Sequence, residues 1–262
     1  ITVYGNWSRG GMQAMDNSLA ENYGTIEIRT NNQGAGMGAT TDSSAVNYGS
    51  IETFGGVSPG MEAYADSSVE NRGSITTHGD YSFGVKADNR STGTNFGSIV
   101  TSGEQAYGMA ASFNSTVRNA PEGTIVTSGD SAHGMVATNV ASADNDGSIT
   151  TTGENAYGMF AKTGSFAANG GTIVTNGTGS HGMVASDDST ALNREDALIN
   201  TKGTLAYGML ATGADSEAIN RGTILTEGSN AAGMAAQEGA TVRNAESGEI
   251  RTPGDYSPGM KA

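Results

Sequence analysis

The stretch NFGSIVTSGEQAYGMAA at residues 95–111 contains the unit that decides the fold. Its Gly-Met pair recurs along the whole chain in copies that lie 24 to 26 residues apart, and Val85 replaces Met once. Met therefore stands at positions 12, 37, 61, 109, 135, 159, 183, 209, 234 and 260. A constant period of this length indicates a repeat architecture, in which each copy forms one structural unit.

Each copy carries the same further marks around its Met. An Ala stands two residues after the Met position, an Asn follows ten or eleven residues after it, and an Ile comes four or six residues beyond the Asn. The extra residues lie in APEG, REDA and AESG (120–123, 194–197 and 245–248) and near Gly213. We expect these insertions in turns, because an added residue inside a strand would turn its buried face outward.

The spacing within a copy predicts strands. Ile99 and Thr101 are two residues apart and share a face, as do Met109 and Ala111, and Val117 and Asn119. No copy shows the i, i+3, i+4, i+7 pattern of an amphipathic helix. Three short strands per repeat predict an all-β fold, a parallel β-helix of about eleven coils with a single β-helical segment over residues 1–262.

Stacking such coils places like residues above one another at the strand spacing of about 4.8 Å. The interior should then consist of Ile, Met and Ala ladders, with a Thr ladder closing the first strand. The Asn column should lie inside a turn, where its amides bond up and down the stack. Because the ladders repeat once per coil and the insertions fall between strands, the coil is the repeating unit of the predicted fold.

Composition excludes several classes of function. The chain has no Cys, which excludes disulfides and Cys-based metal sites. Its net charge of −14 repels phosphate backbones, so no nucleic-acid partner is expected. No apolar run is long enough to span a bilayer, so we expect no direct membrane insertion of this segment. No cofactor is expected.

The repeats GSIVTSGEQAYGMAA, GSITTTGENAYGMFA and GTIVTNGTGSHGMVA resemble those of autotransporter passenger domains, the type V secreted surface proteins of Gram-negative bacteria. The resemblance implies a right-handed β-helix at the cell surface or in the extracellular medium, acting in adhesion or aggregation. It also implies a C-terminal membrane barrel outside this segment. Since neither end differs in composition from the repeats, we expect residues 1–262 to be an uncapped piece of a longer passenger rod.

The residue before Gly-Met forms the first candidate site. Ala106 and Gly108 flank Tyr107 on the opposite face, so this column should point outward. We call it the aromatic column: Phe83, Tyr107, His133, Tyr157, His181 and Tyr207. It is predicted either to contact sugar rings or partner side chains, or only to stack on itself. Its two histidines lie two coils apart, about 9–10 Å, too far to share one zinc ion, so no metal is assigned there.

A second column is acidic and follows the Gly after the Thr ladder, at Asp80, Glu104, Asp130 and Glu154. Stacked carboxylates suit a hard cation such as calcium, but short acidic residues also favour turns for local reasons. A third, shorter column follows the Asn, at Tyr23, Tyr48, Arg72 and Phe96. It either extends a contact surface or shields its turn.

Polysaccharide-degrading β-helices need clustered carboxylates and a base in one groove. The stretch SDDS at 186–189 supplies Asp187 and Asp188, and Arg194 and Glu195 follow in the next insertion. Stacking places Lys162 and Lys202 as the nearest basic residues. Because the coils vary by only two residues, no long loop can form a cleft, and we do not expect an enzyme.

The leading prediction is a structural or adhesive surface rod. Its expected partner is a protein or glycan on a host or sibling cell, together with lateral or end-to-end self-association. A carbohydrate-binding or polysaccharide-degrading β-helix is the first alternative. A subunit of an end-to-end stacked extracellular filament is the second. A cleft with converging Asp residues and a base would favour the enzyme over the rod.

Overall fold

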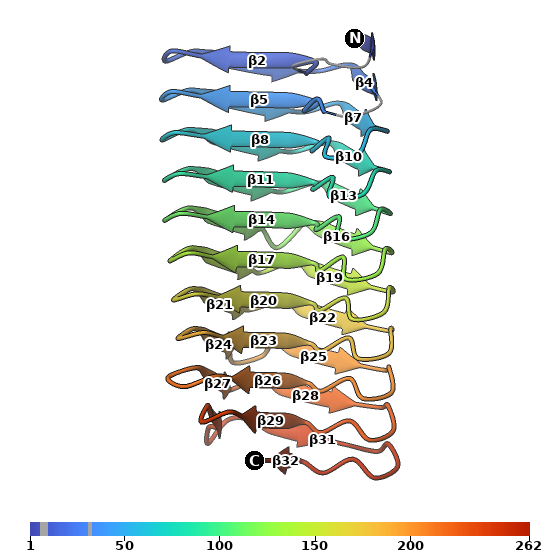
Figure 1. Cartoon of the computed structure of the whole chain (residues 1–262), viewed down its shortest axis with the longest axis vertical. Coiled ribbons are helices and arrows are strands. Elements are labelled where there is room, and N and C mark those ends of the chain that lie inside the picture. Colours follow the sequence, from blue (N-terminus) through green and yellow to red (C-terminus); the bar gives the residue numbers. More distant parts are fainter. Residues whose placement is uncertain (6–9, 31–32) are drawn as a thin grey trace.

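A computed structural model describes residues 1–5, 10–30 and 33–262 and shows a rod of stacked coils (Figure 1). Each coil except the last contributes one strand to each of three parallel sheets, and each inner strand pairs with strands of the coils before and after it. The fold is the predicted all-β, right-handed parallel β-helix with three strands per coil. Among the described residues no helix has the length and hydropathy of a membrane span.

Sheet A is formed by the strands that carry the Ile and Thr ladders. Ile99 pairs with Ile125 of the next coil, and Thr101 pairs with Thr127. The hydroxyl of Thr101 donates to the carbonyl of Ala106 at 2.6 Å, which ties the end of the strand to the following turn. The described strands are β1 (Thr2–Gly5), β4 (Thr25–Thr30), β7 (Ser50–Thr53), β10 (Ser74–Thr77), β13 (Ser98–Thr101), β16 (Thr124–Thr127), β19 (Ser148–Thr151), β22 (Thr172–Thr175), β25 (Leu198–Thr201), β28 (Thr223–Thr226) and β31 (Glu249–Arg251).

Sheet B is formed by the strands that begin at the Met position. Met109 and Ala111 are buried and lie in register with Met135 and Ala137. Gly108 precedes this strand because a Cβ there would lie 2.2 Å from Cγ2 of Ile125. The described strands are β2 (Met12–Met15), β5 (Met37–Thr40), β8 (Met61–Tyr64), β11 (Val85–Asp88), β14 (Met109–Ser112), β17 (Met135–Thr138), β20 (Met159–Lys162), β23 (Met183–Ser186), β26 (Met209–Thr212), β29 (Met234–Gln237) and β32 (Met260–Lys261).

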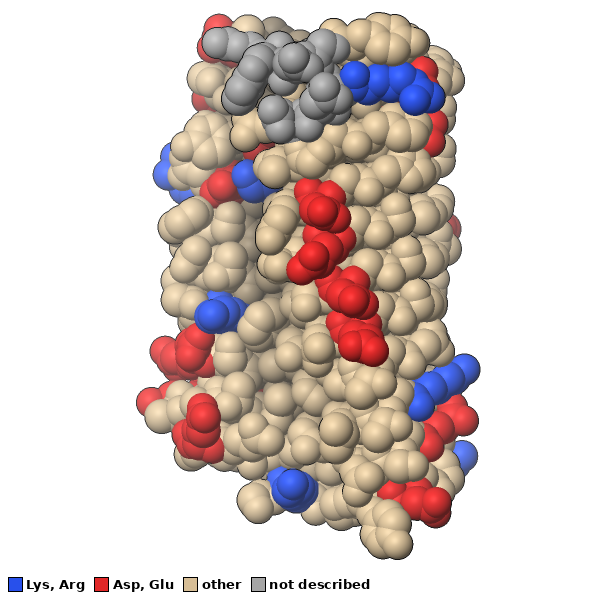
Figure 2. Space-filling model, turned by 45° about the vertical axis from the view of Figure 1, so that its right-hand side comes forward, with Lys and Arg blue, Asp and Glu red and all other residues tan. Residues whose placement is uncertain are grey.

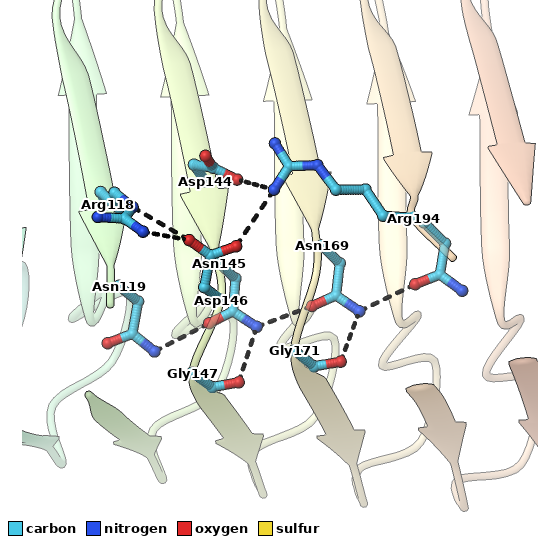
Figure 3. A network of polar contacts seen from close by, with 10 residues as sticks. Arg118, Asn119, Asp144, Asn145, Asp146, Gly147, Asn169, Gly171 and Arg194 are labelled. Atoms are coloured by element: carbon cyan, nitrogen blue, oxygen red, sulfur yellow. Dashed lines mark hydrogen bonds and ion pairs between the residues drawn. The ribbon is translucent and has the colours of Figure 1, made fainter. Parts of the chain in front are cut away.

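Sheet C is formed by the strands that end at the Asn. Asn119, Asn145 and Asn169 follow one another in register, and each donates its amide to the next one's carbonyl oxygen at 2.8 Å (Figure 3). The predicted Asn ladder is thus confirmed. The described strands are β3 (Leu19–Asn22), β6 (Ser44–Asn47), β9 (Ser68–Asn71), β12 (Thr92–Asn95), β15 (Thr116–Asn119), β18 (Ser142–Asn145), β21 (Phe166–Asn169), β24 (Thr190–Asn193), β27 (Glu217–Asn220) and β30 (Thr241–Asn244).

The turns hold the length variation. The three longer insertions all lie between sheet C and sheet A, and the extra residue near Gly213 lies between β26 and β27. The turn between sheets B and C commonly places two adjacent residues in the left-handed region, as at Asn89 (φ 55°) and Arg90 (φ 60°). This requirement explains the many Asn and Asp residues at that turn, since they tolerate positive φ better than most side chains.

Candidate functional site

The aromatic column forms a continuous stack at the turn that leads into sheet B. Successive ring centroids are 5.0 Å apart for Phe83 and Tyr107, 5.1 Å for Tyr107 and His133, and 4.6 Å for His133 and Tyr157. The stack continues through His181 at 5.1 Å and Tyr207 at 4.9 Å. The interplanar angles lie between 6° and 17°, so the rings are nearly parallel. The structure therefore brings all six predicted residues together.

The prediction that this column faces water holds only in part. His133 is 7% exposed and His181 is 9% exposed, while the Tyr and Phe members are half-buried. The ring of Phe160 accounts for part of this burial, because it lies edge-on to His133 at 5.6 Å and to Tyr157 at 5.7 Å. Each ring is also covered by its neighbours in the stack.

The buried histidines have a defined role in the stack. Nδ1 of His133 accepts the backbone N–H of Tyr157 at 2.9 Å, and Nδ1 of His181 accepts that of Tyr207 at 3.0 Å. Because a backbone amide can only donate, both imidazoles must be neutral with the proton on Nε2. Burial, and to a smaller extent the charge of His181, lowers the pKa of His133 to about 3; burial lowers the pKa of His181 to about 4.

A second outward column lies beside the aromatic one and was not singled out from the sequence. It consists of the residue between Met and Ala in sheet B: Ala110, Val136, Phe160, Val184, Leu210 and Ala235 in coils five to ten, counted by Gly-Met copy. Val184, Leu210 and Ala235 form a hydrophobic cluster with Tyr157, Phe160 and Tyr207 packed against it. The sequence signal that could have identified this column is the run of apolar residues at a position that faces outward.

We name the parts of the two columns that lie in coils five to ten, without Phe83 of coil four, the uncharged strip. It comprises Tyr107, His133, Tyr157, His181 and Tyr207 with Ala110, Val136, Phe160, Val184, Leu210 and Ala235. Only the three tyrosines, Phe160 and Ala110 keep notable exposure, since the other members are buried, with Val184 3% and Leu210 8% exposed. The strip is thus a shallow apolar face whose accessible part is mainly the edges of its aromatic rings.

The acidic column lies exposed at successive turns before sheet B. Oδ1 of Asp80 accepts the backbone N–H of Glu104 at 2.8 Å, and Oδ1 of Asp130 accepts that of Glu154 at 2.9 Å. Figure 2 shows acidic side chains in a row along the rod. The hydrogen bonds favour the turn interpretation over the cation one. Within the ranges described, no three or more His, Cys, Asp or Glu residues are grouped to hold a metal ion.

The third column is present in two separate pairs. Tyr23 and Tyr48 stack with their centroids 4.7 Å apart, and the guanidinium of Arg72 lies 4.7 Å above the ring of Phe96. Its residues therefore contact one another along the stack, and the interpretation that they shield their turn stays a prediction. Whether they also contact a partner stays a prediction.

The candidate enzyme residues are not gathered into one site. Arg194 binds Asp144 at 2.8 Å and Asp146 at 3.2 Å, on the turn side of sheet C (Figure 3). Asp187 instead lies 3.9 Å from Lys162, and it occupies an exposed turn with a φ of 53°. The predicted stacking of Lys162 near SDDS is therefore confirmed, but Arg194 serves a different cluster.

Comparison with protein families gives one decisive result. The family model described as "BigA third pectate lyase-like domain" matches residues 1–141 and again residues 97–248. The chain belongs to this family. Two overlapping matches are what a repeat of nearly constant period should give. This pectate lyase-like chain has no significant match among curated proteins.

A solved structure supports the same fold. A chain of "The cryo-EM structure of the Vag8-C1 inhibitor complex" superposes with a TM-score of 0.66 and 16% sequence identity, over 98% of this pectate lyase-like chain and 68% of that chain. Together with the family match, this confirms the recognition of an autotransporter-like passenger domain. The expectation that the chain is not an enzyme stays a prediction.

Proposed function

We propose that the chain is an adhesive section of a passenger rod at the cell surface or in the extracellular medium, and that the uncharged strip binds a protein on a host or sibling cell. The observation that supports this most is the strip itself. The chain carries 27 Asp and Glu residues and a net charge of −14. Even so, two adjacent outward columns run through six coils without a charged residue.

The composition of the strip suits a protein interface. The centre of an interface is poor in charged residues and rich in aromatic ones, and Tyr gives a large contact area for little conformational entropy. Here the rings are already fixed by stacking, so ordering them on binding costs little. The neutral state of His133 and His181 also keeps charge away from the contact. By strand spacing, six coils extend about 25 Å, the scale of a small interface.

The fold comparison supports a protein partner by analogy. The matched solved structure is a complex between Vag8 and C1 inhibitor, so a chain of this fold occurs in a complex with an inhibitor protein. The alternative of a polysaccharide-degrading enzyme has less support, because Asp187 and Arg194 contact different residues. An experiment is needed to distinguish a contact surface from an aromatic column that only stacks on itself.

The experiment replaces the exposed edges of the strip. Cells displaying the chain are compared with cells displaying Tyr107→Ser/Tyr157→Ser/Tyr207→Ser in assays of cell aggregation and of adhesion to host cells. The control is Val100→Ser/Val126→Ser, which removes apolar surface that is 37% exposed at each residue on the outer face of sheet A. We expect at least a tenfold loss of adhesion in the first variant only. Unchanged adhesion in the triple variant, with folding verified by circular dichroism, would leave the column a stacking ladder.

A further inference from the structure

The outer face of sheet B is hollowed in coils one to four, beyond the N-terminal end of the uncharged strip. A groove of about 660 Å³ lies there, a volume within the usual range for small-ligand sites. Its floor is the same outward column that is apolar further along, but the residues are now Gln13, Gly38, Glu62 and Lys86. In Figure 2 the surface on this side of the acidic row is hollowed along the rod.

The groove is open because one position of its floor and one wall have small residues. Gly38 occupies the position that Val136 and Phe160 fill in later coils, and Ala35 and Pro59 precede Gly-Met where the aromatic column later has rings. The nearest atoms to a Cβ on Gly38 would be those of the Gln13 side-chain amide, at 2.4 and 2.6 Å, and none of these belongs to the backbone. The backbone therefore does not require a glycine at position 38, and the open space there results from the choice of residue.

Three aromatic rings line the groove. Tyr64 is the last residue of β8 and is 49% exposed, and Tyr81 lies on the opposite side, in the turn before sheet B, and is 48% exposed. Phe83 is the first ring of the aromatic column, so it stacks on Tyr107 at 5.0 Å and also lines the groove. Flat apolar rings on both sides of a groove can stack against the faces of sugar rings.

The floor offers polar groups without net charge. Nζ of Lys86 lies 3.0 Å from Oε1 of Glu62 and 3.8 Å from Oδ2 of Asp88. Burial lowers the pKa of Lys86, but the charges of Glu62 and Asp88 raise it by more, so its ammonium stays charged. The Lys86 and Glu62 side chains are about one-third exposed, at 31% and 36%. The Lys86 ammonium can donate to hydroxyl groups, and the Glu62 carboxylate can accept from them.

We infer that this groove binds a neutral oligosaccharide, whose sugar faces lie against Tyr64, Tyr81 and Phe83 and whose hydroxyls meet the polar floor. An anionic glycan is disfavoured by the net charge of −14 and by the nearby acidic column. A peptide added as a strand is disfavoured because β5 and β8 are paired on both sides. The site lies in different coils from the uncharged strip and does not depend on the proposed function.

The test uses the 262-residue chain on an array that carries neutral oligosaccharides of glucose, galactose, mannose and N-acetylglucosamine, anionic glycans, and peptides. Gly38→Val fills the groove with the residue that stands at this position in coil six, and Tyr81→Ser removes one ring. Tyr256→Ser is the matched control, because Tyr256 has the same turn position and a φ of 55° against 56° for Tyr81, but lies seven coils away.

We expect neutral glycans to bind the unmodified chain and the Tyr256→Ser variant. Binding should fall at least tenfold in Gly38→Val and in Tyr81→Ser, while Tyr107→Ser/Tyr157→Ser/Tyr207→Ser should retain it. Three results would overturn the inference: no binding to neutral glycans, binding to anionic glycans or peptides only, or neutral-glycan binding that survives Gly38→Val. Because the triple Tyr variant should lose adhesion but keep glycan binding, the groove inference and the adhesion proposal are tested separately.

Discussion

Nδ1 of His133 accepts the backbone N–H of Tyr157, one coil further along the rod, at 2.9 Å. The relationship repeats between His181 and Tyr207. Each histidine therefore connects two coils through a hydrogen bond that exists only while its Nδ1 carries no proton. Protonation would place two donors face to face in a buried position.

This arrangement predicts that the rod loses stability on mild acidification. The folded-state pKa values of His133 and His181 lie at about 3 and about 4, below the ordinary value of 6.5, so protons bind more tightly to the unfolded chain. The stabilisation is complete above pH 6.5 and decreases as the pH falls toward the folded-state values. We expect up to about 1.4 kcal/mol lost per pH unit for each histidine, measured by urea denaturation between pH 7 and 5.

The control for this prediction is His133→Tyr/His181→Tyr, which makes the column Tyr throughout these coils. Its free energy of unfolding should change much less over the same pH range. His78→Gln, which removes an exposed histidine 2.9 Å from Glu52, should leave the dependence in place. An unmodified chain whose stability is flat between pH 7 and 5 would refute the assigned imidazole state.

The Asn ladder should be a major source of stability. The amide of Asn145 donates to Asn169 at 2.8 Å and to the carbonyl of Gly147 at 3.3 Å, and its oxygen accepts from Asn119 at 2.8 Å. Asn145→Ala leaves these buried partners unsatisfied and should cost about 1–3 kcal/mol in chemical denaturation. Asn176→Ala, at an exposed turn, should change stability by less than about 0.5 kcal/mol.

Ala137 tests the width of the core. Its side chain is fully buried in the Ala ladder of sheet B, between Ala111 and Ala161. Ala137→Leu should overpack this ladder and lower the free energy of unfolding by about 1–3 kcal/mol or more. Ala110→Leu makes the same chemical change on the outward face and copies Leu210. Equal stability of the two variants would mean that inward and outward faces are assigned wrongly.

Val140 is a β-branched residue in a left-handed turn, with a φ of 63° and an exposed side chain. This conformation is unfavourable for Val and easy for Gly. Val140→Gly should therefore raise the melting temperature, with a gain of about 0.5–1 kcal/mol. Val100→Gly, in the exposed face of a strand, should lower it. A destabilised Val140→Gly variant would contradict the strain argument.

Sequence reasoning could predict the fold because the period fixes which side chains face inward. Ile99, Met109 and Asn119 each repeat at one position per coil, and only stacked coils place them in ladders. The same reasoning placed the aromatic residues in one outward column and gave stacking on one another as one of two interpretations.

What the repeat could not predict is how outward columns cover one another. Val184 points away from the core and is nevertheless 3% exposed, because its neighbours on the same face pack around it. The burial of His133 has the same origin. The groove depends on Gly38, which lies between the columns of Tyr64 and Tyr81. The shape of the turns brings these columns close together, and period-2 patterns do not describe turns. The left-handed residue pairs of the turns are also invisible to such patterns.

The most direct measurement of the adhesion claim is photo-crosslinking on displaying cells. A benzoylphenylalanine is introduced in place of Phe160, in the middle of the uncharged strip, or in place of Val126 on the outer face of sheet A as the control. We predict that irradiation during adhesion or aggregation joins position 160 to a protein of the partner cell, while position 126 gives none above background. Equal crosslinking from both positions, or none from position 160 while the cells still adhere, would contradict the assignment of the strip as the contact surface.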